Sequence, residues 1–326
     1  MVSGGQRTGR PLKIGLAATS IVVSLLVSEA AARLLGYAPS APGTAAIEPS
    51  VTFDPVLGWI NHPGTTHQWP MGAATFWDDG SRRTRRAERT STRDVVLLLG
   101  CSYTQGYLVG DEDTFAWKLQ QRFPGYDVRN FGTSGYGTYQ SLLRFRRFLE
   151  EGRVPTLVVF GFAEFHGARD RATRSWIESL HVSGNHGVFV PPHVDWTSGG
   201  TVERQGRFVS GASSLARSSA VWNLVETRYA RHVQYAPDDR YTLDAHRAVL
   251  LQLRREVEQA GSKLLLADLW TAPSTRAAWR QFFAEHEFTV AECATNGLPF
   301  KHPDPFWHLQ HADCIERAIR ISGLLE

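Results

Sequence analysis

The most constraining stretch of this 326-residue chain is an aliphatic run that leads directly into a turn. Residues 95–99 read Val-Val-Leu-Leu-Leu, and five consecutive aliphatic side chains predict a strand buried on both faces. Gly100-Cys101-Ser102 then predicts a sharp turn, ahead of a helix over 114–123. A hydroxyl side chain at the carboxyl end of a buried strand lies where open α/β sheets place their chemistry. Ser102 is therefore a candidate nucleophile.

Beyond residue 94 the chain alternates predicted strands with predicted helices. Strands are expected at 95–99, 127–130, 156–160 and 263–268, and helices at 114–123, 138–150, 243–260, 276–285 and 311–325. This alternation predicts an α/β protein with a parallel sheet covered by helices on both faces. Between 181 and 211 the pattern breaks into Gly, Pro and short apolar pieces, which predicts an inserted flap or hairpin. Helical character resumes over 213–229.

The amino-terminal segment, residues 1–37, predicts a transmembrane signal anchor. Basic residues precede an uncharged run over 14–28, and small and apolar residues continue past Glu29 to about residue 35. A bilayer core needs about 20 residues, so Glu29 would lie near the far interface. A cleaved signal peptide is the alternative, because a basic start and an apolar stretch suit it as well. In both cases the basic end stays in the cytoplasm and the body of the protein is exported.

The segments that follow the anchor predict a linker and a lead-in to the main domain. Residues 38–50 are rich in Ala, Pro, Gly and Ser, while residues 51–93 are aromatic and turn-rich without a helical period. We expect 51–93 to form short strands and turns that pack on a main domain over 94–326. The lead-in ends in an arginine run that we expect to be solvated, since no aromatic interleaving points to a nucleic-acid partner. The run comprises Arg82, Arg83, Arg85, Arg86, Arg89 and Arg93.

Three cysteines, Cys101, Cys293 and Cys314, are too few for a disulfide scaffold. We expect all three to be free and buried. A pairing of Cys293 with Cys314 stays open, because an exported protein permits it.

Three short motifs in the right order resemble the SGNH (GDSL-like) hydrolase family. The first is Gly-Cys-Ser-Tyr-Thr-Gln-Gly over 100–106, with Cys101 where the family usually has Asp. The second is Asn-Phe-Gly-Thr-Ser-Gly-Tyr-Gly over 130–137, and the third is Asp-Pro-Phe-Trp-His-Leu-Gln-His over 304–311. The lead-in resembles that of membrane-anchored bacterial members. The resemblance implies a flavodoxin-like three-layer α/β/α fold and an anchor in the bacterial cytoplasmic membrane, with the catalytic domain periplasmic or extracellular.

The same resemblance assigns roles to residues of a serine esterase. It implies Ser102 as nucleophile, His308 as base and Asp304 as the acid that orients the base. The N–H groups of Ser102 and Gly135 would form an oxyanion hole, in which a side chain at position 135 would crowd the substrate oxygen.

Two departures from the family pattern bear on these roles. Asp304 lies four residues before His308, where the family has a spacing of three or two, so a Ser–His dyad assisted by a backbone carbonyl stays open. The third block lacks the usual Asn donor, and His166 is the polar residue expected to replace it.

The resemblance and the exported location together predict hydrolysis of O-acyl or O-acetyl esters through an acyl-enzyme, on envelope carbohydrate or small esters. Trp59, Trp69 and Trp77 are candidates for stacking on sugars, although core packing explains them equally. An O-acyltransferase and a noncatalytic envelope-binding protein are the alternatives. A zinc site is a further alternative, on a cluster made of His302, His308, His311 and Cys314. We expect no cofactor and no metal.

Overall fold

The structure is a computed structural model that describes residues 9–39, 50–87, 94–181, 188–209, 213–233, 241–294 and 302–325. Its contacts divide the chain into two compact units, each of which draws on separate parts of the sequence. The larger unit comprises Ala46–Leu180, Phe189–Phe208 and Ala236–Glu326, and the smaller one Met1–Ala45, His181–Val188 and Val209–Tyr235.

The larger unit is built on a five-stranded parallel sheet with the strand order β13-β12-β7-β5-β6. This confirms the predicted α/β fold. The strands are β5 (Val95–Gly100), β6 (Asp127–Asn130), β7 (Leu157–Ala163), β12 (Lys263–Trp270) and β13 (Val290–Glu292). The edge strand β13 was not expected, because three residues are too few to produce a recognisable pattern.

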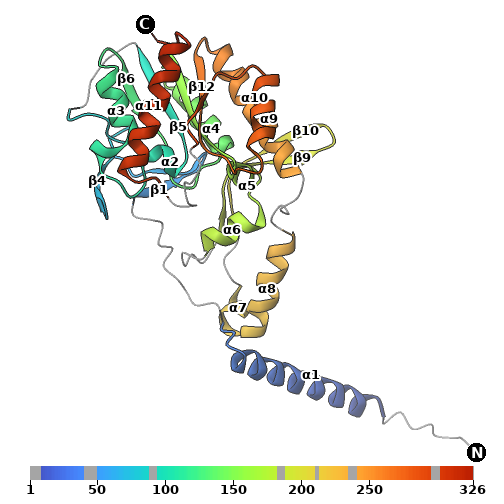
Figure 1. Cartoon of the computed structure of the whole chain (residues 1–326). Helices are drawn as coiled ribbons and strands as arrows, with labels where there is room; N and C mark the ends of the chain where they lie inside the picture. Colours follow the sequence, from blue (N-terminus) through green and yellow to red (C-terminus); the bar gives the residue numbers. More distant parts are fainter. Residues whose placement is uncertain are drawn as a thin grey trace, which may run out of the picture. The chain divides into compact units, whose positions relative to one another are not determined.

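Helices cover both faces of the sheet and give three layers (Figure 1). Alternate residues of β5 explain this: Leu97 and Leu99 belong to one apolar cluster, and Val96 and Leu98 to the other. The first cluster is completed by α4 (Thr138–Glu150), α9 (Tyr241–Gln259) and α10 (Arg276–Glu285), and the second by α3 (Phe115–Arg122) and α11 (Pro305–Ile321). Because parallel strands end at one edge, the segments that follow β5, β6 and β7 meet there.

Shorter elements surround this core. Four two-stranded sheets pair β1 (Val51–Asp54) with β2 (Gly58–Asn61), β3 (Thr66–Trp69) with β4 (Gly72–Thr75), β9 (His193–Thr197) with β10 (Gly200–Arg204), and β8 (Val188–Val190) with β11 (Arg207–Val209). Short helices are α2 (Ser102–Gln105), η1 (Asp111–Asp113), α5 (His166–Asp170) and α6 (Arg174–His181).

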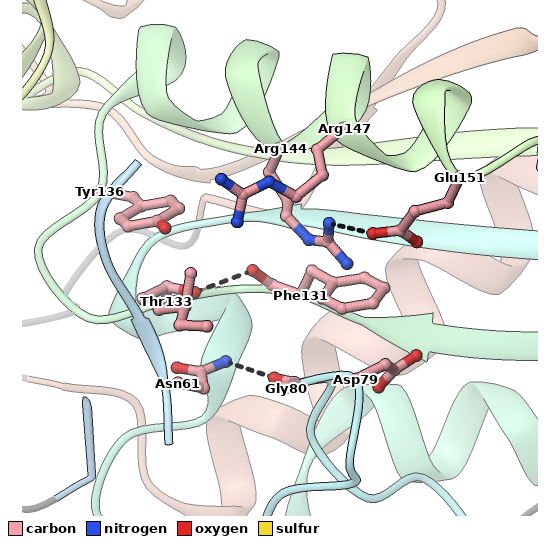
Figure 2. Close-up of a pocket in the computed structure, with 10 residues that line it drawn as sticks. Asn61, Asp79, Gly80, Phe131, Thr133, Tyr136, Arg144, Arg147 and Glu151 are labelled. Atoms are coloured by element: carbon pink, nitrogen blue, oxygen red, sulfur yellow. Dashed lines mark hydrogen bonds and ion pairs between the residues drawn. The ribbon is translucent and has the colours of Figure 1, made fainter. Parts of the chain in front are cut away.

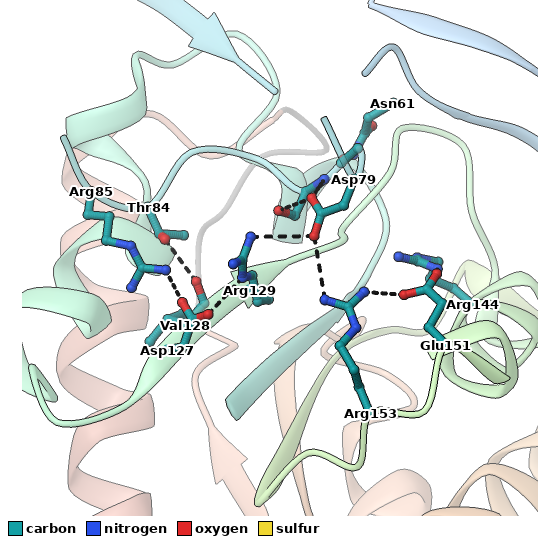
Figure 3. A network of polar contacts seen from close by, with 12 residues as sticks. Asn61, Asp79, Thr84, Arg85, Asp127, Val128, Arg129, Arg144, Glu151 and Arg153 are labelled. Carbon is teal, nitrogen blue, oxygen red and sulfur yellow. Dashed lines mark hydrogen bonds and ion pairs between the residues drawn. The ribbon is translucent and has the colours of Figure 1, made fainter. Parts of the chain in front are cut away.

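The arginines at the end of the lead-in are partly structural, so the expectation of a solvated run is wrong for Arg82. Its guanidinium is fully buried and donates to the carbonyls of Gln105, Gly106 and Val109, beside Asp111. A wider polar network attaches the lead-in to the sheet and α4, and in it Asp79 bridges Arg129 and Arg153 (Figure 3). A buried charge of this kind is tolerated because its donors are satisfied. Arg89 and Arg93 lie outside the described residues.

The smaller unit contains α1 (Gly9–Leu34), α7 (Ser214–Ser218) and α8 (Ala220–Val233). Within α1, Lys13–Leu34 is long and apolar enough to cross a membrane, judged by length and composition. The helical segment expected over 213–229 forms two helices, because Ser219 interrupts it and its hydroxyl accepts a hydrogen bond from Trp222 N.

A disulfide joins Cys293, which follows β13, to Cys314 on α11. The expectation that all three cysteines are free is therefore wrong for two of them. Cys101 is free and buried, as expected. The sequence left this pairing open because 20 residues separate the partners, and only the packing of α11 beside β13 brings them together.

Candidate active site

Ser102 begins the short helix α2 directly after β5, and a pair of glycines makes this sharp turn possible. Gly100 adopts φ +146, and a Cβ there would lie 2.3 Å from Thr104 Oγ1. A Cβ on Gly161, its neighbour across the sheet, would lie 2.1 Å from the same atom. Without these two side chains, Thr104 fits against the strand ends and α2 can approach the sheet. Ser102 thus lies at the carboxyl edge, as expected.

The hydroxyl of Ser102 is in contact with His302, a residue not predicted as the base. His302 Nε2 lies 3.0 Å from Ser102 Oγ. The imidazole packs beside the rings of Tyr107 and Tyr103, with centroid distances of 4.8 and 5.8 Å. Desolvation and the positive charge of Arg169 hold the pKa of His302 below its usual value. A neutral imidazole at this position is able to accept the serine proton.

The structure does not bring His308 to Ser102. His308 is fully buried in the first turn of α11, stacked on Phe115 with ring centroids 5.7 Å apart. Its Nδ1 accepts a hydrogen bond from the Phe115 N–H at 3.3 Å. Burial, followed by the effects of neighbouring cationic groups, lowers its pKa well below the ordinary value. His308 therefore has the environment of a core residue. Its position does not support the role of base that was expected for it.

Asp304 is engaged in capping a helix. Its Oδ1 accepts a hydrogen bond from Trp307 N at 3.1 Å, and Pro305 occupies the first position of α11. Asp at the N-cap followed by Pro is a common helix start. Within the described residues, no hydrogen bond or ion pair joins a carboxylate to His302. The geometry therefore favours a Ser–His dyad without a carboxylate, with His302 in place of His308, for which the sequence left such a dyad open.

This helix start is also the signal that could have identified His302. Because Asp304-Pro305 predicts the beginning of the last helix, His302 lies in the loop before it, whereas His308 lies one turn inside. A loop residue is free to reach across the sheet edge. A residue on the inner face of the helix packs in the core.

Gly135 lies in the loop between β6 and α4 and adopts φ +84, a conformation that favours glycine. The expected reason for this glycine was crowding of the substrate oxygen. In the structure a Cβ would instead lie 2.9 Å from the indole ring of Trp59. Trp59 Nε1 donates to Ser134 O at 2.8 Å, so the lead-in helps to fix this loop. Neither Gly135 N nor Ser102 N makes a hydrogen bond with the described residues.

His166 is fully buried, and its environment is aromatic. The rings of Phe165, Phe160, His246 and Phe162 surround it at centroid distances of 5.3 to 6.5 Å. Neither ring nitrogen has a hydrogen-bond partner within the described residues, and desolvation lowers its pKa well below the ordinary value. No contact with Ser102 or His302 supports the oxyanion role expected for His166.

Arg169, three residues further along α5, interacts with residues adjacent to Ser102 and Gly135. Its guanidinium stacks on Phe165 and Trp176, 4.5 and 4.6 Å from the ring centroids. It donates to Tyr136 O at 2.9 Å, next to Gly135. It also interacts with the side chain of Cys101, the residue before Ser102.

A small cavity of about 170 Å³ lies along the loop that carries Gly135, and Ser102 and His302 are not among the residues that line it. Figure 2 shows Arg144 between Phe131 and Glu151, with its guanidinium 3.8 Å from the Phe131 centroid and 3.1 Å from a Glu151 oxygen. These contacts support the loop from the side of α4.

The alternative zinc site loses a ligand, because the sulfur of Cys314 is bonded to Cys293. The three histidines of the proposed cluster also separate: His302 contacts Ser102, while His308 and His311 pack on Phe115. Within the described residues no group of three or more His, Cys, Asp or Glu is arranged to hold a metal ion.

Comparisons with known proteins gave matches among solved structures. No protein-family model matches the chain, and no curated protein matches it in sequence. Among solved structures, TesA is similar at 14% identity and a TM-score of 0.42, over 71% of this chain and 100% of its own. Structures described as lipolytic proteins of the G-D-S-L family are also among those to which this chain is similar.

Two further solved structures are similar over comparable lengths. A putative lipolytic protein of the G-D-S-L family from Desulfitobacterium hafniense DCB-2 has 12% identity and a TM-score of 0.39, over 69% of this chain and 98% of its own. A catalytic mutant of Axe2, an acetylxylan esterase from Geobacillus stearothermophilus, has 14% identity and a TM-score of 0.39, over 71% and 96%. These similarities are too distant to assign chemistry, which must be argued from the site itself.

Proposed function

We propose that this protein is a serine hydrolase of carboxylic esters in which Ser102 and His302 form the catalytic dyad. The observation that carries this proposal is the 3.0 Å separation of Ser102 Oγ and His302 Nε2. A serine hydroxyl becomes a useful nucleophile when a neutral imidazole is positioned to remove its proton. The lowered pKa of His302 keeps it in that neutral state near pH 7.

The reaction would proceed in two steps. In the first, Ser102 Oγ attacks the ester carbonyl carbon while His302 Nε2 takes the hydroxyl proton. The carbon–oxygen bond to the alcohol then breaks, His302 returns the proton to the leaving oxygen, and the acyl group remains on Oγ. In the second step, His302 deprotonates a water molecule whose oxygen attacks the acyl carbon. The bond to Oγ then breaks, His302 returns the proton to Oγ, and the acid is released with Ser102 and His302 restored.

The negative charge that develops on the carbonyl oxygen requires preorganised donors. The N–H groups of Ser102 and Gly135, which have no partner in the described part of the chain, are two candidates. We assign the third to Arg169, because its guanidinium contacts both the residue before Ser102 and the residue after Gly135. Stacking between Phe165 and Trp176 restricts its position, so little reorganisation is needed during the reaction.

O-acylated carbohydrate is the substrate class that we propose. Trp59 and Trp176 both approach the position of a Gly135 side chain, and both rings are only partly buried. Partly exposed indoles beside a catalytic loop can bind the apolar face of a sugar. Trp69 packs on Tyr107, which contacts His302, and is a further candidate. One of the similar structures is named an acetylxylan esterase, and acetylated xylan is a substrate of this class.

A fluorophosphonate probe tests the nucleophile. The wild-type chain should be labelled on Ser102 and lose esterase activity, while Ser102→Ala should remain folded and unlabelled. His302→Gln should slow labelling strongly, because the hydroxyl loses its base. Absence of labelling in folded wild-type protein would contradict the proposal and favour the noncatalytic binding protein.

A labelled enzyme still leaves two fates for the acyl group. Incubation with an acyl ester and a candidate acceptor glycan separates them. Free acid as the main product supports the hydrolase, and acyl glycan as the main product would make the protein an O-acyltransferase that uses the same dyad.

A further inference from the structure

One face of α8 exposes apolar side chains. Trp222, Val225 and Tyr229 have exposed fractions of 46, 52 and 64%. Their spacing of three and four residues places them on one side of the helix. Leu215 on the neighbouring α7 adds a fourth exposed apolar side chain, at 56%. An exposed apolar surface of this kind is typical of a site that binds a membrane or another protein.

The amino-terminal end of α8 is joined to α1 by several specific contacts. Glu29 of α1 accepts hydrogen bonds from Ala220 N, Val221 N and Ser219 Oγ at 2.7 to 3.1 Å, and so caps α8. Arg33 binds Glu29 at 2.7 Å and also donates to Ser218 O at 3.4 Å.

The chain that leaves α1 is held in the same way, since Asn223 donates to Ala38 O at 2.9 Å. α7 and α8 therefore lie at the carboxyl end of α1 (Figure 1).

These contacts also explain an acidic residue within an apolar helix. A carboxylate in hydrocarbon is costly unless it is paired. Glu29 is paired with Arg33 and lies at the positive end of α8. The uncharged run 14–28 is about 22 Å long at 1.5 Å per residue, which is short of a bilayer core of about 30 Å. If α1 crosses a membrane, Glu29 and the helices bound to it lie at its interface.

The charge and the residue types of α7 and α8 fit a position at the membrane interface. The segment 213–233 contains Arg217, Arg228 and Arg231 against the single acid Glu226, and no lysine or aspartate, which leaves a net charge of +2 with histidine neutral. Basic residues bind anionic lipid headgroups, and Trp and Tyr prefer the headgroup region of a bilayer.

We propose that α7 and α8 form an interfacial collar that binds the lipid surface at the end of α1, with Trp222, Val225 and Tyr229 facing the headgroup and acyl boundary. The collar would hold the exported part of the chain at the membrane surface. This proposal rests on the membrane location of α1 and is independent of the chemistry at Ser102.

Three valines of nearly equal exposure allow a matched test. Val23 on α1, Val225 on α8 and Val154 in the larger unit are 52, 52 and 54% exposed. Each is changed singly to cysteine in the full-length chain and labelled with a fluorophore. The only free native cysteine among the described residues, Cys101, is buried. The proteins are reconstituted in vesicles of phosphatidylcholine and phosphatidylglycerol that carry lipid-bound quenchers.

A quencher deep in the acyl chains should act on Val23→Cys, and one near the headgroups should act on Val225→Cys. Both effects should exceed that on Val154→Cys several-fold. Quenching of Val225→Cys no stronger than that of Val154→Cys would overturn the proposal, as would a label on Val23→Cys that stays accessible to water. A label on Val225→Cys shielded from water and lipid quenchers alike would also overturn it, because the face would then be covered by protein.

Discussion

His302 Nε2 lies 3.0 Å from Ser102 Oγ, although 200 positions separate the two residues. The pair depends on two local features: the turn after β5, which leaves the serine at the strand end, and the loop before α11, which carries the histidine. His308, six residues further on, is buried in the core and stacks on Phe115. Which of two nearby histidines contacts Ser102 is therefore decided by which of them precedes the helix.

We expect His302→Ala to lower kcat by about 10⁴-fold or more, as the loss of a base in a serine hydrolase does. His308→Ala should act differently, since it removes a buried ring from the packing around Phe115. It should cost about 2 kcal/mol or more of the free energy of unfolding and leave kcat per folded molecule near that of wild type. Steady-state kinetics and urea denaturation of both variants test this. Equal loss of kcat in the two would contradict the assignment of His302.

Asp304→Ala should destabilise the protein by about 1 kcal/mol through loss of the cap on α11. Its effect on kcat should remain within a few-fold, because no bond joins Asp304 to His302. Asp304→Ser, which can also cap a helix, should restore most of the stability. A fall in kcat near 10⁴-fold in Asp304→Asn would instead identify Asp304 as the orienting acid.

Arg169→Ala should lower kcat by about 10²- to 10³-fold with a small change in KM, because the lost interaction forms in the transition state. Arg169→Lys should recover only part of the lost kcat, since an ammonium cannot stack on Phe165 and Trp176 as the guanidinium does. Arg320→Ala is a matched control: this exposed arginine also stacks on a ring, that of Phe123, but lies on α11. Unchanged kcat in Arg169→Ala would refute its role and leave the dyad intact.

The pH dependence of kcat/KM should follow His302. The base is active when neutral, so the rate should rise with pH through the pKa of His302 and then level off. Desolvation and Arg169 lower this pKa, which places the rise below the ordinary histidine value. Arg169→Gln removes the positive charge and should move the rise to higher pH. A pH profile that does not shift in this variant would show that Arg169 and His302 are not electrostatically coupled.

Reduction of the Cys293–Cys314 disulfide should destabilise the protein by about 3 kcal/mol, the value expected for a loop of roughly this length. The loop it closes contains His302, so activity should become more sensitive to temperature in Cys293→Ala/Cys314→Ala. Thermal unfolding with and without reductant measures the first effect. An unchanged midpoint would contradict a stabilising role for the disulfide.

Much of the fold could be predicted because its signals are local. The aliphatic run of β5 and the alternation of strands and helices indicate a parallel sheet before any contact is known. The glycine turn ahead of Ser102 likewise depends on neighbouring residues. The three-residue strand β13 was missed, because so short a strand is stabilised by its partner β12 rather than by its own pattern.

The partners of Ser102 could not be predicted in the same way. Position 166 follows β7 as expected, yet its side chain packs in an aromatic cluster, and it is Arg169 that hydrogen-bonds to Tyr136 O beside Gly135. The choice between His302 and His308 depended on where α11 begins and which side of it meets Phe115.

By itself, then, the sequence determined the sheet, the position of Ser102 and the apolar amino-terminal helix, since each follows from residues adjacent in the chain. Only the tertiary structure placed His302 against Ser102, brought Arg169 within electrostatic reach of His302 and joined two cysteines. Those relationships join residues far apart in the sequence, and their orientation is set by the packing of whole helices against the sheet.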